Sequence, residues 1–266
     1  MRPVRLRALH AIVAPALLVP LAACDNNDSP SAPDPTTAAL VVENLVVRLT
    51  LPQAGSSGDA VAELDFTVRE TAGIGATLST LTVTLTDRGG ATQTMEIDPA
   101  EAFGARRIAG GGTLTAKAIS ATTRLDLDGV AVRITFADDG GEQGSVEESM
   151  EVSIDVSGTW TGELPIRTPV GQWTAATLTL EQTGDEITGT LQSADGFQYL
   201  VTGSVTGAGF DILVNGLPGT STCAGVGLTV SELEFRDGRL ERLRGRAFGR
   251  CFGTIAGHFE LQRTAR

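Results

Sequence analysis

Histidine is almost absent from this chain of 266 residues. Of the two present, His10 lies in a leader-like start, so His258 is the only imidazole left for proton transfer near neutral pH. Alternation along its strand places His258 on the same side as Glu260, away from the apolar residues. No Gly-x-Ser-x-Gly elbow and no phosphate-binding glycine loop occurs, and nothing singles out a pair of converging carboxylates. We therefore expect a non-catalytic protein without a cofactor.

Aromatic and basic residues are also scarce. Aromatic side chains make up 5% of the chain, too few for the exposed aromatic platform of a carbohydrate-binding protein. The formal net charge is −12, and Lys117 is the single lysine. Three arginines lie within the first seven residues, so the chain without them carries a charge of about −15. Because such a surface repels phosphates, we do not expect nucleic acid as a partner.

Three cysteines, Cys24, Cys223 and Cys251, limit the metal chemistry. Structural zinc needs four ligands, more than the later thiols and one histidine offer. The acidic segments 126–129 and 138–142 carry oxygen ligands of the kind that calcium takes. Aspartate and glycine are also ordinary turn residues, so we expect turns there and no metal site.

The start of the chain has the layout of a secretory signal. A basic segment, residues 1–7, is followed by an apolar or small stretch from Ala8 to Ala23 that only His10 interrupts. This stretch is too short to span a bilayer as a helix, and Pro15 and Pro20 break it. Residues 1–23 are therefore expected to be a signal peptide.

The segment Leu21-Ala22-Ala23-Cys24 resembles the lipobox of bacterial lipoproteins. The resemblance implies cleavage before Cys24, a thioether-linked diacylglycerol on its sulfur, and acylation (for example by palmitate) of the freed amine. The alternative is an ordinary signal peptide with a chance cysteine. Asp25 resembles the inner-membrane retention signal of enteric bacteria, but the choice between inner and outer membrane stays open. The expected location is extracytoplasmic, in the cell envelope.

The rest of the chain divides by composition. Residues 24–37 are polar and rich in proline, as expected for a lipidated cysteine followed by a disordered tether. Two further domains are predicted over 38–156 and 157–266. With Cys24 taken by lipid, Cys223 and Cys251 remain as an even pair in an oxidising compartment, and we predict one disulfide between them.

The first predicted domain alternates apolar and polar residues, the period of half-buried strands. Its apolar sets are Leu45, Val47, Leu49 and Leu51; Leu64, Phe66 and Val68; Leu81, Val83 and Leu85; Val130, Val132, Ile134 and Phe136; and Met150, Val152, Ile154 and Val156. About seven short strands in roughly 120 residues favour a two-sheet sandwich. The segments Glu70-Thr71-Ala72-Gly73 and Asp138-Asp139-Gly140-Gly141 resemble bacterial Ig-like domains. The longest helix expected is a single turn at 99–103.

The second predicted domain contains both tryptophans and the only tyrosine. Its eight expected strands are 158–164, 173–182, 186–192, 198–206, 209–215, 226–235, 239–248 and 252–262. Short links between successive strands favour an up-and-down antiparallel β-barrel. Gly158-Thr159-Trp160 is similar to the Gly-x-Trp motif of lipocalins and other calycins, which implies a small calycin-like barrel. The alternative is a second sandwich. The predicted fold class is thus all-β, an Ig-like sandwich followed by a barrel.

Arg242, Arg244 and Arg246 share one face of a predicted strand. They form either an anion-binding stripe or charge pairs with Glu232 and Glu234 of the preceding strand, and we favour the pairs. Two functions remain. A lipid-anchored binding module would hold a small apolar ligand in the barrel, whereas an interaction lipoprotein would present an Ig-like spacer and a barrel to another envelope protein. Partners are therefore the membrane, through Cys24, and an apolar ligand or an envelope protein.

Overall fold

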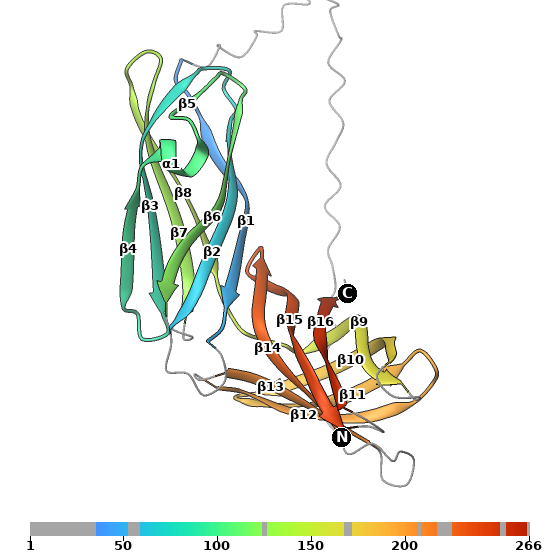
Figure 1. Ribbon diagram of the computed structural model, residues 1–266. Coiled ribbons are helices and arrows are strands. Elements are labelled where there is room, and N and C mark those ends of the chain that lie inside the picture. Colours follow the sequence, from blue (N-terminus) through green and yellow to red (C-terminus); the bar gives the residue numbers. More distant parts are fainter. Residues whose placement is uncertain are drawn as a thin grey trace, which may run out of the picture. The chain divides into compact units, whose positions relative to one another are not determined.

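The structure is a computed structural model that describes residues 36–52, 59–123, 127–167, 172–206, 209–216, 225–250 and 254–264. The predicted signal peptide, most of the tether and all three cysteines lie outside these ranges. Residues Pro35–Arg266 form one compact unit. Figure 1 shows that this unit is built almost wholly from strands.

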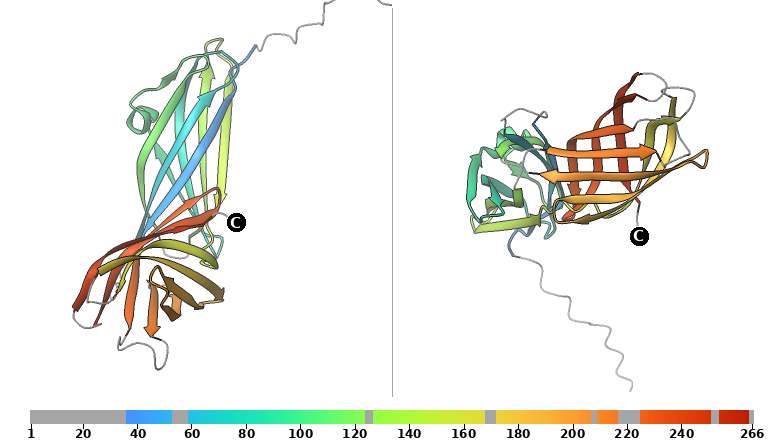
Figure 2. Two further views of the ribbon diagram at one scale, coloured as in Figure 1. Left: turned by 90° about the vertical axis from the view of Figure 1, so that its right-hand side faces the viewer. Right: turned by 90° about the horizontal axis from the view of Figure 1, so that it is seen from below.

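The first half of the unit contains eight strands and one helical turn. They are β1 (Leu40–Thr50), β2 (Ala60–Glu70), β3 (Ala76–Asp87), β4 (Thr92–Ile97), α1 (Pro99–Phe103), β5 (Arg107–Ile108), β6 (Thr113–Thr123), β7 (Leu127–Asp138) and β8 (Gln143–Glu151). β6, β2 and β1 lie side by side in one sheet, and β4, β3, β7 and β8 form a separate sheet to which β5 adds. Figures 1 and 2 show these as two facing layers.

The predicted apolar sets belong to the hydrophobic core. Every residue of the five sets predicted from the alternation is buried. The single helical turn is also confirmed. Its N-cap Asp98 accepts a hydrogen bond from the amide of Ala100 at 2.8 Å, and Gly104 ends it in the left-handed conformation with φ of 72°. Phe103 of this turn packs edge-to-face on Phe66, with ring centroids 5.7 Å apart.

The second half is a closed barrel of eight antiparallel strands. They are β9 (Gly158–Arg167), β10 (Gln172–Thr183), β11 (Glu186–Ser193), β12 (Gln198–Thr206), β13 (Gly209–Gly216), β14 (Val226–Arg236), β15 (Arg239–Arg250) and β16 (Thr254–Arg263). Each strand begins within two residues of its predicted start. Successive strands pair, and β16 returns to pair with β9. The predicted all-β class and the up-and-down barrel are confirmed.

Trp160 lies where the barrel closes. Its side chain is 0% exposed, and its indole Nε1 donates a 2.8 Å hydrogen bond to the carbonyl of Val156. The guanidinium carbon of Arg263, at the end of β16, lies 4.8 Å from the indole centroid. Next to them Gly162 approaches β16 so closely that a Cβ would lie 2.1 Å from the carbonyl oxygen of Glu260. The closure therefore requires a glycine there and is sealed by an aromatic–cation contact.

β14 is shared by the two halves of the unit. Its first part, Val226–Val230, pairs with β13 inside the barrel, and its second part, Glu232–Arg236, pairs with Val46–Thr50 of β1. One eleven-stranded sheet therefore runs from the barrel through β14 and β1 to β6. We call this pairing of β14 with β1 the seam; it was not predicted from the sequence.

Candidate functional site

The three arginines singled out from the sequence lie on β15. Arg242, Arg244 and Arg246 alternate with Leu243 and Ala247, which are buried inside the barrel. The arginines therefore share the outer face, as the alternation predicts.

Two of these arginines are engaged by carboxylates. Arg242 contacts Glu234 at 3.2 Å and Glu260 at 3.0 Å, and Arg244 contacts Glu232 at 2.6 Å and Glu260 at 3.0 Å. Partial burial lowers the pKa of Arg244, but hydrogen bonds to Glu260 and Glu232 outweigh it, so the pKa is raised overall. The geometry favours cross-strand charge pairs over an anion-binding stripe at these two positions.

The third arginine has a different setting. Arg246 is exposed and lies opposite Thr229 on β14 and His258 on β16. Among the described residues it forms no ion pair. His258 is exposed beside Glu260, while Phe259 and Leu261 of the same strand are buried, as predicted. An exposed arginine next to an exposed histidine provides no enclosed site for chemistry.

The charge pairs continue across the seam. Arg48 on β1 lies 3.8 Å from Glu234 and 4.0 Å from Glu63, and it also binds Asp65 on β2. Asp65 accepts a 2.7 Å hydrogen bond from the amide of Ala118. The bond to Asp65 raises the pKa of Arg48. Glu234, which is buried, thus links charges on both sides of the seam.

The aspartates of the 138–142 turn bind groups of the protein itself, a backbone amide and an arginine. Asp138 accepts a 2.9 Å hydrogen bond from the amide of Glu142, and Asp139 forms a two-point pair with Arg107 at 2.5 and 2.8 Å. Asp126, part of the other acidic segment, lies outside the described residues. Within the described ranges no three metal-ligating side chains cluster together.

The size of the inward side chains changes along the axis of the barrel. We call the end at which β10, β12, β14 and β16 begin the rim, and the opposite end the base. Large buried side chains fill the base: Trp160, Leu178, Leu180, Ile187, Phe210, Ile212 and Leu261. Near the rim, small inward residues lie beside large buried ones: the small ones are Thr174, Ala176, Ser193, Ala247 and Gly257, and the large ones include Leu191, Tyr199 and Leu228. A side chain bordering an empty, ligand-sized cavity would retain accessible surface, so these buried side chains leave no room for a ligand at the base or inside the barrel beneath the rim.

Large apolar side chains are exposed around the rim. Every exposed large hydrophobic residue of the described chain lies within four residues of a strand end there: Trp173, Phe197, Leu200, Leu213 and Phe248. Phe248 is 55% exposed, and its ring lies over Gly227, which pairs with Leu213. Such a concentration on a soluble surface is typical of a binding region. We call these five residues the apolar rim.

Trp173 connects the apolar rim to the interior. It is 36% exposed, and its indole lies so close to Gly257 of β16 that a Cβ there would be 2.3 Å from the ring. Phe197 is held by a turn in which Ser193 donates to its carbonyl at 2.9 Å and accepts from its amide at 3.2 Å. Burial, followed by the charge of Asp195, raises the pKa of nearby Tyr199. The Trp173 indole therefore fills the space that Gly257 leaves at the rim.

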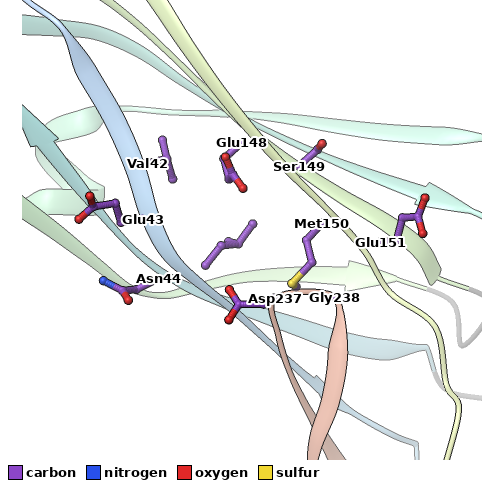
Figure 3. A pocket seen from close by; sticks show the side chains of 10 residues that line it. Val42, Glu43, Asn44, Glu148, Ser149, Met150, Glu151, Asp237 and Gly238 are labelled. Carbon is purple, nitrogen blue, oxygen red and sulfur yellow. The ribbon is translucent and has the colours of Figure 1, made fainter. Parts of the chain in front are cut away.

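A hollow with a volume of about 690 Å³ lies at the seam. Figure 3 shows β1 on one side of it, β8 on the other, and the β14–β15 turn below. The lining residues are Val42, Glu43, Asn44, Leu45, Glu148, Ser149, Met150, Glu151, Asp237 and Gly238. We call it the seam groove. A bulge in β1 between Glu43 and Val46 and the left-handed Asn44 and Asp237, with φ of 56° and 49°, shape its lower part.

Neither the apolar rim nor the seam groove was found from the sequence. A signal for the rim was present, because Leu200, Leu213 and Phe248 are large apolar residues at outward positions close to strand ends. The groove carried no such signal, since it depends on β1, β8 and the β14–β15 turn meeting in space.

The remaining predicted site residues, Cys24, Cys223 and Cys251, lie outside the described residues. In the described ranges, no helix has the length and apolar character needed to cross a bilayer. Comparison with protein-family models, curated proteins and solved structures finds no match to this chain.

Proposed function

We propose that this chain is a lipid-anchored, extracytoplasmic binding module without catalytic activity, and that the rim of its barrel binds a small apolar molecule. The observation that carries this proposal is the gathering of all exposed large apolar side chains of the described chain at one end of the barrel. Burial of apolar surface stabilises a complex by roughly 25 cal/mol per Å².

The position of the ligand follows from the interior. Because buried side chains fill the interior, the ligand lies on the exposed apolar rim, against Trp173. An eight-stranded barrel can either hold one small ligand or be filled by side chains; here side chains fill the interior, and the ligand binds at the mouth of the barrel. The Gly-x-Trp resemblance to calycins, with Trp160 at the closure, agrees with such a role.

Fluorescence titration with N-phenyl-1-naphthylamine tests the proposal. We expect saturable binding at one site per chain, quenching of Trp173 emission, and loss of affinity in a Trp173→Ser variant. The matched control is Met95→Ser on β4, a partly exposed apolar residue outside the barrel. Absence of saturable binding, or equal losses in both variants, would refute a ligand site at the rim.

A second candidate is an interaction protein that contacts another envelope protein. Leu213 and Phe248 favour it, because they face outward across β13, β14 and β15 rather than into the barrel. If Phe248→Ser leaves probe binding unchanged but abolishes capture of an envelope protein by crosslinking in cells, the rim serves a protein partner.

A further inference from the structure

The seam groove is bordered by strand edges. β8 is the last strand of its sheet, and no described strand pairs with its outer edge. Across the groove, β14 covers only Val46–Thr50 of β1, so the outer edge of Leu40–Leu45 has no strand partner among the described residues. An unpaired edge exposes peptide N–H and C=O groups that can pair with an added strand.

The hydrogen-bond pattern identifies the free peptide groups. The amide of Val152 donates to the carbonyl of Asp128 on β7 at 2.8 Å, so the peptide groups of Val152 face β7. Because alternate residues of an antiparallel strand point their peptide groups to opposite sides, those of Ser149 and Glu151 face the groove. The carbonyl of Glu151 is covered there by the β14–β15 turn, where a Cβ on Gly238 would lie 3.4 Å from it. By the same reasoning, the carbonyl of Ala39 accepts a 2.9 Å hydrogen bond from the amide of Thr71, just after β2, so the peptide groups of Leu40 and Val42 face outward.

The side chains in the groove combine an apolar floor with acidic walls. Val42, Leu45 and Met150 are buried at its floor. Glu148, Glu151 and Asp237 line it, and within the described ranges none of the three forms an ion pair. The fourth lining acid, Glu43, is already paired with Arg69. The groove therefore presents three uncompensated carboxylates beside a free strand edge.

We infer that an extended, basic peptide segment of a partner protein binds the seam groove by adding a strand to the edge of β8. Main-chain hydrogen bonds to the peptide groups of Ser149 and to the amide of Glu151 would supply the register, and alternating basic side chains would pair with the carboxylates. The four residues of β8 that line the groove span about 13 Å, enough for a short strand of the partner.

Charge favours a basic partner segment over two other possible occupants of the groove, the chain's own tether and a second copy of the chain. The chain's own predicted tether carries Asp25, Asp28 and Asp34, and its prolines lack the N–H groups that strand pairing needs. A second copy pairing through its own β8 would place like charges opposite each other, which destabilises cross-strand pairs. A basic segment has the complementary charge.

The test uses three synthetic hexapeptides: alternating Lys and Val, alternating Glu and Val, and the Lys–Val peptide methylated at its backbone nitrogens. We expect only the first to bind in fluorescence anisotropy, and to slow hydrogen exchange at the amides of Ser149 and Glu151. Binding should weaken when the salt concentration rises from 50 to 300 mM, because added salt shortens the screening length and weakens the charge pairs.

The matched variants separate groove charge from overall charge. Glu148→Gln with Glu151→Gln and Asp237→Asn should weaken the Lys–Val peptide about tenfold, the sum of three modest exposed pairs. Glu181→Gln, an exposed carboxylate on the outside of β10, should leave affinity unchanged. Absence of Lys–Val binding would overturn the inference. So would equal binding of the methylated peptide, equal binding of the acidic peptide, or exchange protection away from β8.

Discussion

Glu70 allows a quantitative test of what stabilises the two sheets of the first half. This carboxylate, at the end of β2, is 1% exposed. Its two oxygens accept four backbone N–H groups, from Gly111 and Gly73 at 2.7 Å, Ala72 at 2.8 Å and Ala39 at 3.2 Å. Those donors come from three separate segments of the chain, so the carboxylate joins them at one end of the sandwich.

The size of the effect follows from the pKa of Glu70. Burial alone raises this pKa, but the four N–H groups stabilise the anion by more, so the pKa falls from 4.5 to about 2. Each unit of pKa corresponds to about 1.4 kcal/mol, so the ionised carboxylate contributes about 3 kcal/mol to folding at neutral pH. Because the folded pKa lies below the unfolded one, this contribution is complete above pH 4.5 and is lost as pH falls through about 2.

We therefore expect Glu70→Gln to lower the free energy of unfolding by about 3 kcal/mol at pH 7. An amide offers one acceptor oxygen, and its NH₂ group would face N–H donors. Urea unfolding followed by far-UV circular dichroism measures the loss. The difference between wild type and variant should shrink as pH falls from 4.5 toward 2. Glu96→Gln, an exposed residue on β4, is the control and should change little.

Two results would refute this reasoning. A loss of the same size at pH 7 and at pH 2 would mean that shape rather than charge matters at Glu70. Unchanged stability at pH 7 would mean that water replaces the four hydrogen bonds at no cost.

Three further predictions follow. Trp160→Phe should lower the free energy of unfolding by about 2–4 kcal/mol, because it leaves a void and removes the hydrogen-bond donor to the carbonyl of Val156 in a buried site. Urea unfolding measures this loss, and a variant as stable as the wild type would contradict a buried, hydrogen-bonded indole. Cys24→Ala should release the protein from membranes washed with high salt, and a variant that still pellets would contradict a lipid anchor. Peptide mass spectrometry without reduction should find Cys223 linked to Cys251, whereas alkylation of both thiols in the folded protein would contradict the disulfide.

Strand positions were largely readable from the sequence because burial on one face imposes a period of two. Val47 and Leu49, like Val132 and Ile134, are separated by polar residues and proved buried on a common face. Turns such as Asp237-Gly238 marked the hairpins, since both residues adopt positive φ. Local periodicity thus located the strands of both halves.

Pairings between distant strands were not readable in the same way. Glu232 and Glu234 were recognised as partners of Arg242 and Arg244 because a hairpin fixes their register. Arg48, some 190 residues earlier, contacts Glu234 only because β1 lies beside β14. The seam, and the groove beside it, depend on edge-to-edge pairing, which leaves little trace in the alternation of either strand.

The sharing of β14 has a mechanical consequence. Any pull on a tether before Leu40 acts along β1, whose residues Val46–Thr50 are held by β2 on one side and by β14 on the other. A load directed along β1 shears its hydrogen bonds to β2 and to β14 all at once, instead of opening them one bond at a time. Since β14 continues into the barrel wall, the load passes directly into the barrel. Tension at the proposed anchor would thus be borne by the sheet and not by the single covalent connection between the two halves.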